Sequence, residues 1–175
     1  MDKRGITLLI GLGNPILGDD GVGWRIVQKI EDALGDGIIS SAHPKVETEY
    51  LSLGGLSLME RMDGYQDVIV VDSILTGTKP SGTIYSLPLS KLPNLASGHT
   101  TAIHDASLAT ALDVGRKMGM VLPKDVWVVA VEADNVYVFS EDLSPEIEAV
   151  VPNAVELVLE ILVKGLREEK IYDLT

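Results

Sequence analysis

Cysteine is absent from this chain of 175 residues. Its absence excludes a cysteine nucleophile, a thiolate metal site and any disulfide framework. Basic residues are also few, since 14 lysines and arginines stand against 26 aspartates and glutamates and leave a net charge of -12. Nucleic acids and anionic membrane surfaces are bound through clustered basic side chains, so we expect neither as a partner.

Long hydrophobic runs are missing as well. No segment of the sequence approaches the roughly 20 apolar residues that a membrane-spanning helix needs. The start, MDKRGITLLIGLG, places basic residues before a short apolar run. A signal peptide needs a longer apolar stretch and a small-residue cleavage site. We therefore interpret this run as a buried strand and expect a cytoplasmic protein.

What is present is the composition of an ordinary globular protein. Hydrophobic residues make up 46% of the chain and charged residues 23%. This mixture is typical of a folded protein rather than a disordered one. The length fits one domain, and no repeat, linker or low-complexity tract divides the sequence. We expect residues 1–175 to form a single domain.

Short apolar runs alternate along the chain with segments of helical spacing. The runs predict strands at 6–10, 46–53, 68–73, 82–87 and 126–133, and the spacing predicts helices at 22–34, 56–62, about 104–118 and 145–166. Residues 82–87 fit an antiparallel or edge strand, and 88–101 and 134–144 are expected to be irregular. Such alternation predicts an α/β fold in which a largely parallel sheet is covered on both faces. Ligands of these folds gather at the carboxyl ends of the strands.

The first of these ends carries the turn GLGNPILGDDGVG at 11–23. A dinucleotide fingerprint would need glycine where Ile16 stands, and the adjacent Asp19 and Asp20 would repel a pyrophosphate. We predict that Asp19 caps the first helix by accepting backbone N–H groups. Asp20 is then available as a charged oxygen ligand for a metal ion.

Two further positions suggest a mixed oxygen and nitrogen site for a divalent metal. Asp72 closes a buried strand, where it is either a structural cap or a functional group at the carboxyl edge. His99 and His104 both lie near the start of one predicted helix. His43 precedes a proline in a connecting loop, and we expect it to be a solvated surface residue.

Three segments together resemble the signature segments of the nickel–iron hydrogenase maturation endopeptidases. They are GLGNPILGDDGVG at 11–23, VDS at 71–73 and IHDASL at 103–108. The resemblance extends over nearly the whole chain. It implies a three-layer α/β/α sandwich around a mostly parallel twisted sheet, of the phosphorylase/hydrolase-like kind.

The resemblance also implies a site and a substrate. The family's nickel-sensing triad falls on Asp20, Asp72 and His104, which would act both as catalytic residues and as metal ligands. The family removes a C-terminal peptide from a hydrogenase large-subunit precursor after nickel has been inserted. The expected cofactor is therefore nickel supplied by the substrate, with no tightly bound resident metal.

Alternatives remain open at this stage. The protein could be a metal-sensing chaperone of a hydrogenase subunit that does not cleave, or a hydrolase with a resident metal. Whether the metal or an aspartate performs the chemistry is equally open. Gly54 and Gly55 either admit an extended peptide to the backbone or form a tight turn.

Overall fold

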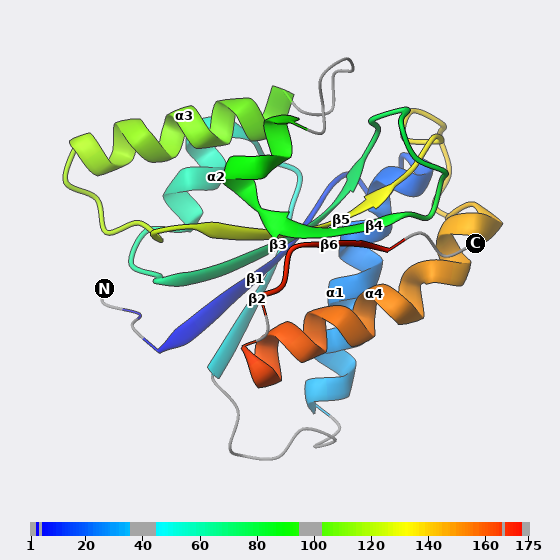
Figure 1. The fold of residues 1–175 in the computed structure, drawn as a ribbon, viewed down its shortest axis with the longest axis horizontal. Helices are drawn as coiled ribbons and strands as arrows, with labels where there is room; N and C mark the ends of the chain where they lie inside the picture. Colours follow the sequence, from blue (N-terminus) through cyan, green and yellow to red (C-terminus); the bar gives the residue numbers. More distant parts are fainter. Residues whose placement is uncertain (1–2, 4, 36–44, 95–102, 166, 173–175) are drawn as a thin grey trace.

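A six-stranded sheet with helices on both faces forms the body of the protein (Figure 1). The computed structural model describes residues 3, 5–35, 45–94, 103–165 and 167–172, with the backbone alone for 93, 94, 103–107 and 164. The strands are β1 (Ile6–Leu12), β2 (Lys45–Leu51), β3 (Asp67–Ile74), β4 (Ile84–Pro88), β5 (Val126–Glu132) and β6 (Lys170–Tyr172). Their order across the sheet is β2-β1-β3-β5-β4-β6.

The strand directions make this a mostly parallel sheet. Strands β2, β1, β3 and β5 are parallel, and β4 runs antiparallel to both β5 and β6. The carboxyl ends of the four parallel strands therefore lie at the same edge of the sheet. This edge is where a site is expected in such a fold.

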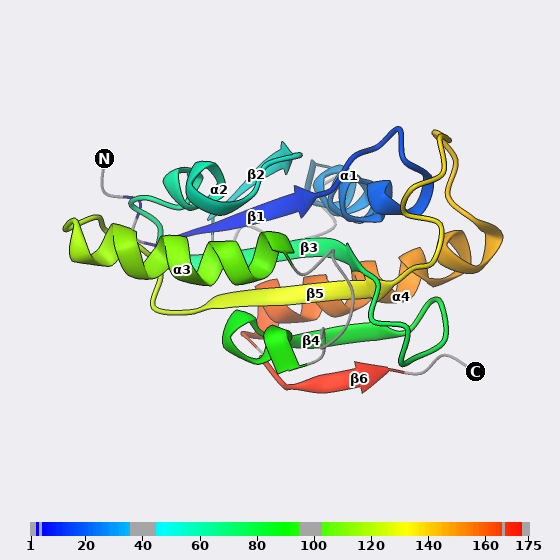
Figure 2. The same ribbon diagram turned by 90° about the horizontal axis from the view of Figure 1, so that it is seen from above.

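The helices divide between the two faces of the sheet, as Figures 1 and 2 show. One face carries α1 (Val22–Gly35) and α4 (Pro145–Lys164), and the other carries α2 (Gly55–Arg61) and α3 (Ile103–Lys117). Two short 3-10 helices, η1 (Gly18–Gly21) and η2 (Leu89–Asn94), join the regular elements. The arrangement is the three-layer α/β/α sandwich that the sequence predicts.

Each layer of helices covers its own hydrophobic core. Along β1, Leu8 and Ile10 belong to the core under α2 and α3, whereas Leu9 between them belongs to the core under α1 and α4. In β3, Val70 and Val71 divide between the two cores in the same way. Because both faces are buried, these strands appear in the sequence as uninterrupted apolar runs.

Most of the predicted elements are confirmed. For the strand predicted to be antiparallel or at the edge, the structure shows the antiparallel alternative, with β6 paired along the outer side of β4. One prediction is wrong in part. The first part of the segment expected to be irregular at 88–101 is the 3-10 helix η2, and 95–101 lies outside the described residues. No helix in the described part of the chain is long and apolar enough to cross a membrane.

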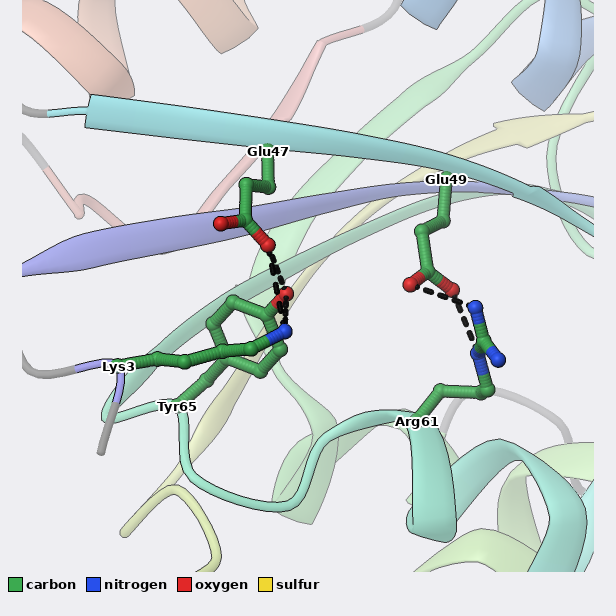
Figure 3. A network of polar contacts seen from close by, with 5 residues as sticks. All are labelled: Lys3, Glu47, Glu49, Arg61 and Tyr65. Atoms are coloured by element: carbon green, nitrogen blue, oxygen red, sulfur yellow. Dashed lines mark hydrogen bonds and ion pairs between the residues drawn. The ribbon is translucent and has the colours of Figure 1, made fainter. Parts of the chain in front are cut away.

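Edge strand β2 makes two groups of polar contacts, one with α2 and one with the residues before β1 and after α2 (Figure 3). Arg61 donates two hydrogen bonds of 2.8 Å to the carboxylate of Glu49. Glu47 accepts hydrogen bonds from the Tyr65 hydroxyl and from the Lys3 ammonium group. The contact of Arg61 with Glu49 joins α2 to β2, and the segment between the two elements lies beside the cavity described next.

Candidate active site

A cavity of about 420 Å³ opens at the carboxyl ends of the parallel strands. Residues from the ends of β1 and β3 and from the segments after β1, β2 and β5 line it. They are Leu12, Gly13, Asn14, Leu17, Asp20, Ser52, Leu53, Asp72, Ser73, Val136 and Tyr137. Two of the three predicted site residues, Asp20 and Asp72, therefore face one cavity at the predicted edge of the sheet.

The turn after β1 fixes the carboxylate of Asp20. Its Oδ2 accepts a hydrogen bond of 2.7 Å from the backbone N–H of Asn14. Gly13 makes this close approach possible, because its φ is 123° and a Cβ there would lie 1.9 Å from the carbonyl oxygen of Asp20. A residue with a side chain could not occupy that position without moving the turn.

Ser73 connects the two carboxylates of the cavity. Its hydroxyl donates to Oδ1 of Asp20 over 3.0 Å, and its backbone N–H donates to Oδ1 of Asp72 over 2.8 Å. The side chain of Ser73 is buried. Because both oxygens of Asp20 accept hydrogen bonds, the orientation of that carboxylate is set before any ligand arrives. Supporting hydrogen bonds of this kind orient carboxylate ligands in metal sites.

Asp19 does not cap the first helix, so that prediction is wrong. Its carboxylate is fully buried and accepts hydrogen bonds from the backbone N–H of Ser144, at 2.6 Å, and from the Ser144 hydroxyl, at 2.9 Å. Ser144 is the N-cap residue of α4. Asp19 is not at the start of α1 because η1, an additional helical turn, precedes that helix. Within η1 the side chain of Asp19 points into the interior and that of Asp20 faces the cavity.

The backbone of His104 lies in the first turn of α3, close to the helix start that the sequence predicts. The position of its side chain lies outside the described part of the structure, as do His43 and His99. Among the side chains that are described, no group of three or more histidines, cysteines, aspartates and glutamates could hold a metal ion. Of the predicted triad, the structure therefore describes the side chains of the two carboxylates, Asp20 and Asp72.

The sequence analysis missed a buried carboxylate at the carboxyl edge of the sheet. Glu132, at the end of β5, accepts hydrogen bonds from the N–H and hydroxyl groups of Thr76, the N–H of Gly77 and the hydroxyl of Tyr85, at 2.7 to 3.0 Å. Burial, together with the hydrogen bond to Glu132, raises the pKa of Tyr85 to about 12. The network anchors the segment that follows Asp72 and Ser73. In the sequence, Glu132 is the one acidic residue in the apolar run 126–133, and this could have indicated a buried carboxylate.

The two glycines after β2 form the entry to α2. Gly54 is its N-cap residue in an extended conformation, and Gly55 has a φ of 56°, which favours glycine. Their geometry supports the turn interpretation. The neighbouring Ser52 and Leu53 line the cavity, so this turn forms part of its wall.

The hydrogenase maturation protease family matches residues 52–161, which is more than half of the chain. The chain belongs to this family. The matched segment contains Asp72 and His104, and Asp20 precedes it. Family membership makes the protein a peptidase and gives the cavity with its two carboxylates the role of a candidate active site.

Individual relatives cover nearly the whole chain. The hydrogenase 2 maturation protease of Escherichia coli (strain K12) is 26% identical over an alignment 175 positions long, which covers 95% of this chain and 98% of that protein. The solved structure of the hydrogenase maturating endopeptidase HybD from E. coli has a TM-score of 0.70 at 28% identity and covers 94% of each chain.

An archaeal structure shows the same similarity. The hydrogenase 2 maturation peptidase from Thaumarchaeota archaeon SCGC_AB-539-E09 has a TM-score of 0.60 at 26% identity, covering 89% of this chain and 97% of that one. The shared architecture therefore extends well beyond the matched segment 52–161.

Proposed function

We propose that this peptidase removes the C-terminal extension from a nickel-loaded hydrogenase large-subunit precursor. The observation that carries the proposal is the pair of carboxylates, Asp20 and Asp72, facing one cavity and linked through Ser73. The relatives are named as hydrogenase maturation proteases, and a protease for a folded subunit needs an open site rather than a closed pocket. A cavity at the edge of the sheet, formed by segments from four strands, meets that need.

Nickel enters this proposal as part of the substrate. Asp20 and Asp72 supply oxygen ligands, and we propose that His104 supplies a nitrogen ligand from the first turn of α3. Three protein ligands leave positions open on a divalent ion. The remaining positions belong to the precursor, so binding requires a precursor that already carries its metal. In the same proposal, no metal stays bound to the peptidase between turnovers.

The chemistry assigned to the site is hydrolysis of a peptide bond held beside the two carboxylates. An ionised carboxylate can accept a proton from water and act as a general base. A metal ion held against the scissile segment can polarise its carbonyl group. Asp20 suits the ligand role because its orientation is fixed at both oxygens. The cytoplasmic location expected from the sequence is part of the same proposal.

The test is cleavage of purified precursor, with and without nickel, followed by intact mass measurement. We expect cleavage near the C-terminus of the loaded form alone. Asp20→Asn, Asp72→Asn and His104→Ala should each lower the rate by orders of magnitude, whereas His43→Ala should not. Equal rates for loaded and nickel-free precursor would contradict the role of nickel while leaving the peptidase assignment in place.

Two other outcomes point to the alternative functions. Tight binding of loaded precursor without any cleavage would indicate a metal-sensing chaperone. Stoichiometric zinc that survives dialysis of the purified protein would indicate a hydrolase with a resident metal. His104→Ala should weaken cadmium or nickel binding, and His99→Ala should not.

A further inference from the structure

Four apolar side chains are exposed beside the candidate active site. Ile16 lies in the segment after β1, and Tyr137, Val138 and Phe139 lie in the segment after β5. We call these four residues the apolar strip. Phe139, the one phenylalanine of the sequence, is 82% exposed, and Tyr137 is 66% exposed. Grouped exposed apolar residues are typical of interaction surfaces.

The apolar strip rests on two segments that are hydrogen-bonded to each other. The N–H of Ser140 donates to the carbonyl of Ile16 at 3.1 Å, and the N–H of Gly18 donates to the carbonyl of Ser140 at 2.8 Å. Figure 2 shows the two segments side by side, beyond the carboxyl ends of β1 and β5. These hydrogen bonds restrain the two segments that carry the strip. Less conformational entropy is then lost when a partner binds.

The apolar strip is continuous with the wall of the cavity. Tyr137 belongs to both, and the buried Val136 before it also lines the cavity. Leu53, which also lines the cavity, is exposed, and Leu56 follows it at the start of α2. A polypeptide in the cavity beside Asp20 and Asp72 would therefore meet apolar side chains from the segments after β2 and β5.

We infer that the apolar strip is the docking surface for the hydrogenase large-subunit precursor, whose own apolar side chains pack on Tyr137, Val138 and Phe139. The inference rests on the proposed function. The precursor is a better occupant than a second copy of this chain, because a copy seated on Tyr137 would cover the cavity that the substrate has to enter. This chain has a net charge of -12, so binding through charged groups would require a basic partner. Binding through apolar side chains does not have that requirement.

The test compares two double variants in the full-length protein. Val138→Ser with Phe139→Ser removes the outer half of the strip. Met118→Ser with Val121→Ser is the matched control, because these residues are exposed to a similar degree, at 75% and 59%, beyond the last turn of α3. Exposed positions contribute little to folding, so both variants should keep the melting temperature of the parent protein.

The readouts are kcat and KM for cleavage of nickel-loaded precursor, together with the mass of each protein in solution. We expect KM to rise about tenfold or more for the strip variant with kcat unchanged, since the side chains contribute to binding rather than to the reacting atoms. The control variant should keep both constants.

Unchanged KM in the strip variant, with normal cleavage by the parent protein, would overturn the docking inference and leave the proposed function standing. A parent protein that is a dimer, and that the strip substitutions convert to a monomer with unchanged KM, would overturn it in favour of a second copy. A parent protein that neither binds nor cleaves loaded precursor would overturn the proposed function, and the docking inference with it.

Discussion

Asp19 and Asp20 are neighbours in the sequence with different surroundings. Asp19 is buried against Ser144, and Asp20 faces the cavity. Asp19→Asn replaces one of the two accepting oxygens by an NH2 group, which can only donate, so one donor of Ser144 loses its acceptor and the NH2 group is buried without a partner. We expect this change to lower the free energy of unfolding by about 1–3 kcal/mol. Asp20→Asn should cost less stability, because Asp20 is partly exposed.

The measurement is denaturant unfolding of both variants beside their cleavage rates. Asp19→Asn should have the lower unfolding midpoint, and Asp20→Asn the lower activity. A lower unfolding midpoint in Asp20→Asn than in Asp19→Asn would contradict the separate roles of the two carboxylates.

Ser73 gives a second prediction at the scale of single residues. Ser73→Ala removes the hydroxyl that donates to Asp20 and keeps the backbone N–H that donates to Asp72. Loss of such a supporting hydrogen bond typically costs about 10–100-fold in metal affinity or activity. We expect a loss of that size in cadmium affinity and in cleavage of loaded precursor. Ser73→Thr keeps a hydroxyl and should recover most of both.

At the scale of elements, the start of α1 is packed directly on the ends of two strands. A Cβ placed on Gly23 would lie 2.3 Å from the carbonyl oxygen of Val71 in β3 and 2.4 Å from that of Leu12 in β1. Both contacts are with backbone atoms, which cannot move away by a change of rotamer as a side chain can. Gly23→Ala should therefore push α1 away from the sheet and lower the free energy of unfolding by about 1–3 kcal/mol.

Thermal and denaturant unfolding will measure this loss. Gly35→Ala is the matched control within the same helix, because a Cβ at Gly35 would meet nothing within 4 Å. Equal unfolding midpoints for the two variants would contradict the close packing of α1 on β1 and β3.

The elements that the sequence predicts best are those with a strong pattern of their own. The run at 68–71 is apolar because β3 is buried on both faces, and the helix from Val22 shows its stripe of core residues. The strand β6 has three residues, of which Lys170 and Ile171 are exposed, so no pattern marks it in the sequence. β6 forms because β4 has an unpaired side on which it can pair, and the folding of the rest of the sheet creates that side.

The same contrast holds for the candidate site. Asp20 and Asp72 can be predicted because each follows an apolar run, and the carboxyl ends of parallel strands meet at one edge. The hydrogen bond between Ser73 and Asp20 spans 53 positions and depends on how η1 packs against β3. The burial of Asp19 depends on the docking of α4 in a similar way, and this is why the helix-cap prediction was wrong.

At the scale of the whole molecule, stability should depend on pH at the alkaline end. The pKa of Tyr85 is raised to about 12 from its ordinary value of 10.0, first by burial. Above pH 10 the unfolded phenol loses its proton while the folded one keeps it, so each rise in pH favours unfolding. We expect stability to fall between about pH 10 and 12 for this reason.

Tyr85→Phe should weaken this pH dependence, at the cost of one hydrogen bond to Glu132 at every pH. Urea unfolding between pH 8 and 11.5 will measure both effects. Part of the slope should remain, because burial also raises the pKa values of Tyr50 and Tyr65. If the free energy of unfolding falls with pH as steeply in Tyr85→Phe as in the parent protein, folding does not raise the pKa of the Tyr85 hydroxyl.

Surface segments that join a strand to a helix usually tolerate changes of length, both in evolution and in the laboratory. The segment after β1 has lost this freedom, because Gly18 and Asp19 are attached to Ser140 and Ser144 in the segment after β5, and Asp20 is attached to Ser73 in β3. With one residue inserted between Asp19 and Asp20, the contact of Asp19 with Ser144 could be kept only by turning Asp20 away from Ser73. The turn that bears Asp20 should therefore tolerate insertions less well than an ordinary connection between a strand and a helix.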